Sequence, residues 1–155
     1  MKKAFFYLAA VAAVLVSCDK KEIDEAPVRP QEADYVGTVT VTFRDTDYDN
    51  ENISVNFIPN EKGDSASVTI HQIRFVPQMP VTIDITIPGI TLSSTDDKVT
   101  LSGDSIVPRA LGGSPYPRYT VTGLNGELKG NDLSFSLKFG DYPTSFHGIR
   151  QTVTQ

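Results

Sequence analysis

The stretch VTGLNGELKGNDLSFSLKF, residues 121–139, decides the fold. In its second half, residues 132–139, every other position is apolar, which is the pattern of a β-strand with one buried face. Residues 119–128 read as a second strand, and the Gly-Asn-Asp sequence at 130–132 is typical of a tight hairpin turn. The stretch therefore predicts two neighbouring antiparallel strands.

Similar short strands are predicted on both sides of this hairpin in the sequence. A slip in the apolar phase at His71 and Gln72 predicts a β-bulge. Pro88 and Gly89 predict a turn, and the proline- and glycine-containing residues 108–117 predict a loop. The expected strands span residues 35–44, 52–58, 65–75, 81–87, 90–94, 98–102, 119–128, 132–139 and 145–152.

The composition favours an all-β protein. Threonine, valine, isoleucine and phenylalanine dominate, and no stretch after residue 30 carries apolar residues at helical spacing. Short strands separated by turn residues at intervals of about 8–12 residues indicate a barrel or a sandwich. Closure removes the exposed edges of a long meander, so we expect an eight-stranded up-and-down antiparallel β-barrel, with a β-sandwich as the alternative.

The N-terminus carries the features of an export signal. Lys2 and Lys3 precede an apolar run at residues 4–16, which is too short for a membrane-spanning helix of about 20 residues. The sequence Leu-Val-Ser-Cys at 15–18 resembles the bacterial lipobox, which implies cleavage before Cys18 and acylation of its thiol. The alternatives are a secreted protein with a chance cysteine, or an uncleaved anchor; no second cysteine exists for an intramolecular disulfide.

These features divide the chain into a lipoprotein signal peptide at 1–17, a charged flexible tether at 18–32 and a barrel domain at 33–155. Removal of the signal peptide takes away two lysines, so the formal charge falls from −5 to −7. Such an acidic chain argues against binding to nucleic acid or to anionic lipid headgroups. The expected contact with the membrane is through the acyl chains on Cys18.

Four pieces resemble the calycin-like, or lipocalin-like, lipoproteins of the Bacteroides group. They are ADYVGTVTVTF at 33–43, VTIHQIRF at 68–75, VTIDITIPGITL at 81–92 and the hairpin stretch at 121–139. The resemblance covers residues 33 to about 152 and implies an eight-stranded barrel without an assigned function. The chain departs from true lipocalins, because it has no tryptophan and Gly37 is followed by Thr-Val.

The resemblance also bears on location. In the Bacteroides group, acidic residues near the acylated cysteine resemble a signal for export to the surface, whereas an aspartate directly after it indicates inner-membrane retention in some other Gram-negative bacteria. Asp19 and the acidic residues after it fit both descriptions. We expect a lipid-anchored protein of the cell envelope, with the outer membrane, on its periplasmic face or at the cell surface, favoured over the inner membrane.

Few residues suggest chemistry. The acidic run at 45–51 begins like a calcium loop but has Asn50 where that loop needs glycine and Asn56 where it needs glutamate, so a solvated hairpin loop is the simpler interpretation. His71 and His147 are the only histidines, too few for a zinc site, and no Gly-x-Ser-x-Gly element is present. We expect no enzyme activity, metal or cofactor.

Two serines are candidates for modification. Asp-Ser-Ala and Asp-Ser-Ile, centred on Ser65 and Ser105, resemble the three-residue O-glycosylation acceptor of exported proteins in the Bacteroides group. Both serines fall at the ends of expected strands, where a modifying enzyme could reach them.

The interior separates two hypotheses about function. The first is a barrel that binds a small apolar ligand, and the second is a closed module that contacts an envelope protein or a glycan. Eight-stranded barrels are either just filled by side chains or hold one small ligand, and branched and aromatic residues at most inward positions favour filling. The candidate ligand-lining residues are Phe43, Phe57, Ile85, Phe135 and Phe139.

Overall fold

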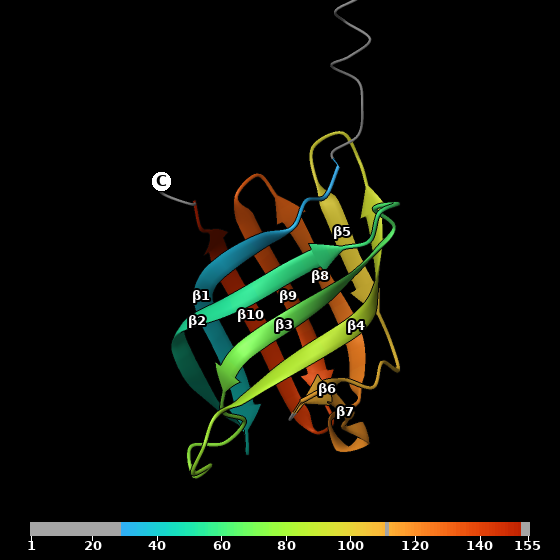
Figure 1. Cartoon of the computed structure of the whole chain (residues 1–155). Coiled ribbons are helices and arrows are strands. Elements are labelled where there is room, and N and C mark those ends of the chain that lie inside the picture. The colour runs from blue at the N-terminus through green and yellow to red at the C-terminus, as the bar shows by residue number, and fades with distance from the viewer. Residues whose placement is uncertain (1–28, 111, 153–155) are drawn as a thin grey trace, which may run out of the picture.

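A computed structural model describes residues 29–110 and 112–152 of the chain. Eight strands form a closed, up-and-down antiparallel barrel (Figure 1). They are β1 (Ala33–Phe43), β2 (Thr46–Pro59), β3 (Ser65–Ile73), β4 (Ile83–Ser94), β5 (Val99–Gly103), β8 (Val121–Lys129), β9 (Asp132–Phe139) and β10 (Tyr142–Arg150). The sheet closes where β1 pairs with β10, from Tyr35 opposite Arg150 to Val41 opposite Thr144. The predicted barrel is confirmed.

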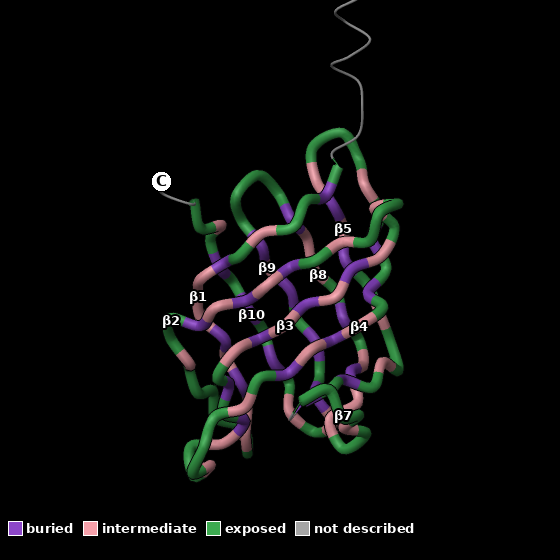
Figure 2. Tube along the Cα trace, viewed as in Figure 1, coloured by how far each residue is buried: buried purple, intermediate pink, exposed green. Residues whose placement is uncertain are grey.

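The core consists of inward-facing side chains, which alternate with outward-facing ones along each strand. Along β9, Leu133, Phe135, Leu137 and Phe139 point inward and are at most 5% exposed, as the sequence pattern predicts. Buried and exposed positions alternate in the same way around the barrel (Figure 2). Burial of a large aliphatic or aromatic side chain contributes about 1.5–3 kcal/mol, so these inward rows dominate the stability of the fold.

The bulge predicted at His71 and Gln72 is confirmed. The pairing of β3 with β4 shifts between Ile70 and Ile73, and Gln72 adopts a left-handed backbone with a φ of 59°. The Asp84 carboxylate on β4 accepts a hydrogen bond of 2.9 Å from the Gln72 backbone N–H. A bulge leaves a backbone group outside the ladder, and this carboxylate satisfies it.

The turn predicted at Pro88 and Gly89 is wrong, because β4 continues through it as one strand. Ile87 lies opposite Val68 and Ile90 lies opposite Ala66, so β4 has one more residue than β3 over this interval. Gly89 takes the left-handed conformation that accommodates the extra residue, with a φ of 69°. The proline–glycine pair therefore marks a second bulge.

Three other predicted boundaries differ. The second strand begins at Thr46 instead of residue 52, so most of the acidic run at 45–51 lies in a strand and not in a loop. Asn52 has a φ of 58°, and the extra residue there keeps β2 in register with β1. The last strand begins at Tyr142 instead of residue 145.

The predicted loop at 108–117 contains two short strands, β6 (Arg109–Ala110) and β7 (Ser114–Pro115), which extend the sheet from β4.

The barrel has two ends that differ in their connections. The N-terminal end carries residues 29–32, 60–64, 95–98, 130–131 and 151–152. The distal end carries residues 44–45, 74–82, 104–110, 112–120 and 140–141, including β6, β7 and the short 3-10 helix η2 (Pro117–Tyr119). Figure 1 shows the chain entering the barrel at the N-terminal end, at the top of the view, and the distal end at the bottom.

Candidate functional site

The barrel interior is filled by side chains. An interior void of about 150 Å³ lies among apolar residues and contains no space for a water-sized molecule. The residues that line it are Val68, Ile87, Ile90, Leu101, Leu124 and Phe135. An apolar ligand would need several of these side chains to move, which a closely packed core resists.

The five candidate ligand-lining residues do not share one pocket. Phe57, Ile85 and Phe139 are fully buried in the core, and Phe135 is the one of the five that borders the void. Phe43 is partly exposed and lies at the distal end, with its ring centre 6.1 Å from that of Tyr142. The inward assignment of four of these side chains is thus confirmed, whereas their role in binding stays a prediction.

Aromatic side chains close the distal end of the barrel. The ring of Phe75, which is 1% exposed, stacks on Tyr119 at 4.5 Å and on Tyr142 at 5.7 Å, and meets Phe139 edge-on at 5.3 Å. Offset-stacked and edge-on ring pairs contribute about 0.5–1.5 kcal/mol each beyond their burial. We call the six rings gathered here the distal cluster: Phe43, Phe75, Tyr116, Tyr119, Phe139 and Tyr142.

The η2 helix and the β9–β10 turn hold the tyrosines of this cluster in place. The Gly140 N–H donates a 3.0 Å hydrogen bond to the Thr120 carbonyl, and the Tyr116 N–H donates one of 2.8 Å to the Pro108 carbonyl. Gly140 has a φ of 57°, and a Cβ atom there would lie 2.5 Å from the Arg118 carbonyl oxygen. Only glycine permits this close approach of the turn to the helix.

Three exposed arginines are each adjacent in sequence to one ring of the cluster: Arg44, Arg74 and Arg118. The guanidinium carbon of Arg44 lies 5.0 Å from the centre of the Phe43 ring, and that of Arg118 lies 5.9 Å from the Tyr119 ring. Both distances are within the range of a cation–π interaction, about 6 Å. Within residues 29–110 and 112–152, none of the three arginines forms an ion pair.

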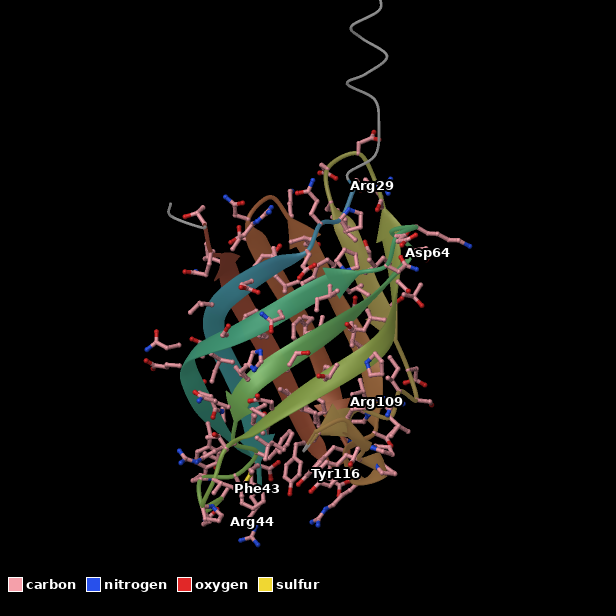
Figure 3. All side chains as sticks on the ribbon, in the orientation of Figure 1. Arg29, Phe43, Arg44, Asp64, Arg109 and Tyr116 are labelled. Atoms are coloured by element: carbon pink, nitrogen blue, oxygen red, sulfur yellow. The ribbon has the colours of Figure 1, made fainter. Side chains whose placement is uncertain are left out.

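Figure 3 shows Phe43, Arg44 and Tyr116 together at this end of the barrel, opposite Arg29 and Asp64. Burial raises the pKa of Tyr119 above its ordinary value, although the nearby Arg118 charge lowers it in part. Tyr119 is therefore a neutral phenol at pH 7 and retains a proton to donate. The distal end combines neutral rings with guanidinium charges, which suits it to an anionic partner that also offers apolar surface.

The N-terminal end is held by polar contacts instead. The Asn60 side-chain oxygen accepts hydrogen bonds from the backbone N–H groups of Gly63, Asp64 and Ser65, at 2.8, 3.1 and 3.3 Å. The Arg29 guanidinium donates to the Glu61 carbonyl at 3.0 Å. Pro30, which belongs to the expected tether at 18–32, is buried against the barrel.

The histidines and the acidic run lie on the outside of the barrel. The His71 Nδ1 atom lies 3.1 Å from an Asp84 carboxylate oxygen, and its Nε2 atom lies 2.5 Å from the Asn56 side-chain oxygen. The exposed His147 lies 3.8 Å from Asp132. In the acidic run, Asp47 accepts a hydrogen bond from the Thr42 hydroxyl, as Asp49 does from that of Thr40. No group of three metal-ligating side chains occurs in the described part of the chain.

The outer face of β1, β8, β9 and β10 is hollowed into two adjoining grooves of about 480 and 390 Å³, lined by apolar and by hydroxyl-bearing side chains. The hydroxyl groups of Thr40, Ser136 and Ser145 line both grooves. Water competes well for exposed hydroxyls, so a hydrogen bond there has a small net free energy, about 0.5–1.5 kcal/mol. These grooves therefore indicate a binding site less specifically than the distal end does.

The two serines predicted to be glycosylated lie at opposite ends of the barrel. Ser65 begins β3 and is partly buried, whereas Ser105 is exposed after β5 with a φ of 56°. Their glycosylation stays a prediction. Cys18 and the signal peptide lie outside the described residues.

Sequence reasoning missed the distal cluster, although one signal could have revealed it. The pairs Phe43-Arg44, Arg74-Phe75 and Arg118-Tyr119 each join a ring to an arginine where an element begins or ends. At a strand end, neighbouring residues point to opposite faces, so Phe43-Arg44 and Arg74-Phe75 each predict an inward ring beside an outward charge. Arg118 and Tyr119 are neighbours at the end of the η2 helix. Three such ring–arginine pairs at one end of a barrel predict a group of aromatic side chains with positive charges around it.

Comparison of the chain with protein-family models, curated proteins and solved structures found no match. Among the described residues, no helix has the length and apolar character required to cross a membrane. The fold class rests on the geometry of the chain itself: an eight-stranded, closed, up-and-down antiparallel β-barrel, which is consistent with a calycin-like fold.

Proposed function

We propose that the protein is a non-enzymatic interaction module, tethered to the cell envelope by acyl chains on Cys18. The filled barrel interior carries this proposal, because the interior void has no space for a water-sized molecule and so offers no preformed site for a small apolar ligand inside the barrel. Its function then depends on its outer surface. The closed barrel and the lipobox-like sequence at 15–18 together support a place among the calycin-like lipoproteins of the Bacteroides group.

The position of the tether supports an outward-facing role. The chain enters the barrel at the N-terminal end, and Pro30 packs there beside the β2–β3 loop. An anchor at Cys18 would hold this end nearer to the membrane, with the outer membrane favoured. The distal end, with its rings and arginines, would then face away from the lipid.

Binding of a small apolar ligand is the alternative function, and Phe135, which borders the interior void, is the residue that such a ligand would contact. A fatty-acid or solvatochromic-dye titration of residues 18–155 with Cys18→Ser separates the two. We expect no saturable binding, and binding near one probe per chain that Phe135→Glu abolishes in a folded protein would overturn the closed module.

The anchoring part has its own test. Labelled palmitate should be incorporated into the full chain and not into its Cys18→Ser variant, which should also leave the membrane fraction. Equal labelling, or identical fractionation of the two proteins, would contradict the tether while leaving the closed interior untouched.

A further inference from the structure

We infer that the distal end is a docking surface for an acidic segment or surface of another protein. Arg44, Arg74 and Arg118 would bind its carboxylates, and the partly exposed rings of the distal cluster would contact its apolar side chains. This inference rests on the proposed interaction function and gives that function a location and a partner class. It does not depend on acylation of Cys18.

Charge complementarity is the first argument. The distal connections contain four arginines and three aspartates, whereas the connections at the N-terminal end contain three basic residues and five acidic ones. In a chain with a formal charge of −5, the distal end is therefore a local exception. Arginine presents a planar fork that binds carboxylates through two parallel hydrogen bonds, which lysine does not.

The residue types at the distal end are the second argument. Tyrosine, phenylalanine, methionine and arginine are enriched in the buried centres of protein interfaces, and tyrosine and arginine recur as their strongest contributors. Met79 is partly buried against the same core, and its sulfur accepts a hydrogen bond of 3.1 Å from the Phe75 N–H. Val81 and Val107 add apolar surface, with exposed fractions of 61% and 39%.

Preorganisation is the third argument. The rings of Phe43 and Tyr119 hold the guanidinium groups of Arg44 and Arg118 by cation–π contacts. Ordering a flexible side chain on binding costs about 0.5–1.5 kcal/mol, and a side chain that is already ordered avoids much of that cost. The two arginines are thus placed for a partner before it arrives.

The packing of the rings favours a protein over a glycan. Phe75 stacks on Tyr119 with an interplanar angle of 17° and on Tyr142 with one of 25°. These contacts use ring faces within the cluster, whereas sugar recognition by an aromatic side chain needs an open ring face. The tyrosines that remain partly exposed suit side-chain contacts with a protein surface better.

The test uses a random copolymer of glutamate and tyrosine as the probe. It is titrated into isotope-labelled residues 18–155 carrying Cys18→Ser, and amide chemical shifts are followed by NMR. We expect shifts concentrated in residues 74–82 and 104–120. The combined Arg44→Ala, Arg74→Ala and Arg118→Ala variant should bind about tenfold more weakly or worse, because several charge-assisted hydrogen bonds are lost.

The matched control removes three positive charges from the other end, through Arg29→Ala, Lys62→Ala and Arg150→Ala, and should leave the affinity for the copolymer within about twofold. Circular dichroism and denaturation check that all variants stay folded. The inference is overturned by three results: equal loss in the control, no distal shifts with the copolymer, or equal binding of dextran sulfate or of anionic phosphatidylglycerol vesicles. If the apolar dye also fails to bind, the closed module survives these results and only the docking surface is lost.

Discussion

The two ends of the barrel close the same sheet by different means. The N-terminal end uses short loops with polar contacts, such as the three backbone hydrogen bonds accepted by Asn60. The distal end uses longer connections and a cluster of six rings, with exposed arginines around them. Polar loops are sufficient to cap a barrel, so the aromatic and cationic character of the distal end is better explained by recognition than by closure alone.

The largest expected difference between the ends is in their core residues. Phe75→Ala should lower the free energy of unfolding by about 3–5 kcal/mol, because it removes a ring that stacks on two others and leaves a cavity. Pro30→Ala should cost about 1 kcal/mol or less, since a small ring at the edge of the barrel is lost. Chemical denaturation measures both, and similar costs for the two would contradict the unequal roles of the ends.

Two glycines that flank β9 provide a matched pair. Gly140 at the distal end and Gly130 at the N-terminal end have φ values of 57° and 60°, so alanine costs about 1–2 kcal/mol of backbone strain at each. At Gly140 the added Cβ also meets the Arg118 carbonyl, whereas at Gly130 it meets nothing within 4 Å. We expect Gly140→Ala to cost about 1–2 kcal/mol more than Gly130→Ala.

The same pair has a second readout. Gly140→Ala should displace η2 and shift the amide resonances of residues 116–120, whereas Gly130→Ala should leave them unchanged. An equal loss of stability in both variants, with no change at 116–120, would show that the turn does not hold the helix.

The polar end should respond to loss of its side-chain acceptor. Asn60→Ala removes the side-chain acceptor of three backbone N–H groups of the β2–β3 loop, of which only that of Gly63 keeps a second acceptor, the Asn60 carbonyl at 3.1 Å. We therefore expect a loss of about 1–2 kcal/mol. Amide exchange should rise in residues 61–65 and stay unchanged at the distal end. The Asn60 amide also donates a 2.7 Å hydrogen bond to the Asp64 carboxylate, so the control is the double variant Asn60→Asp and Asp64→Asn. It keeps the acceptor for the backbone N–H groups, exchanges the donor and acceptor of that pair, and should retain most of the stability.

The smallest effect concerns the β3 bulge. The hydrogen bond from the Gln72 N–H, assisted by His71, holds the pKa of Asp84 below its ordinary value. A carboxyl group whose pKa is lower in the folded state stabilises the protein above its unfolded pKa, and this contribution is lost as the pH falls through the folded pKa. The Asp84 side chain is 59% exposed, so the contribution is less than about 1 kcal/mol.

Between pH 7 and pH 2, the free energy of unfolding of the parent protein should fall by the contribution of the Asp84 carboxylate. This fall should be absent from Asp84→Asn. An unchanged slope in the variant would mean that the bulge does not depend on the charged carboxylate.

The sequence predicted most of the fold because periodicity reports burial directly. Alternation along residues 132–139 placed β9 without error, and the phase slip at His71 and Gln72 located a bulge. The Pro88-Gly89 pair was misinterpreted because a left-handed glycine serves a bulge as well as a turn. The acidic run was assigned to a loop because charge on an outer strand face resembles charge in a loop.

The candidate site was less accessible from sequence. Phe43, Phe75, Tyr119 and Tyr142 come from four separate segments, and only closure of the barrel brings them together. The inward rings of Phe57 and Phe139 predicted a lining, but local patterning does not show how completely side chains fill an interior. Packing density depends on shapes from all eight strands at once.

Recognition of a partner through the distal end can be measured directly. A photo-reactive amino acid placed at Val107 and, separately, at Ile58 of the N-terminal end tests it in intact cells, because the two positions are similarly exposed, at 39% and 42%. We expect an adduct of one defined mass from position 107, lost when Arg44, Arg74 and Arg118 are all replaced by alanine, and none from position 58. An adduct from position 58 alone, or one from position 107 that persists without the arginines, would contradict it.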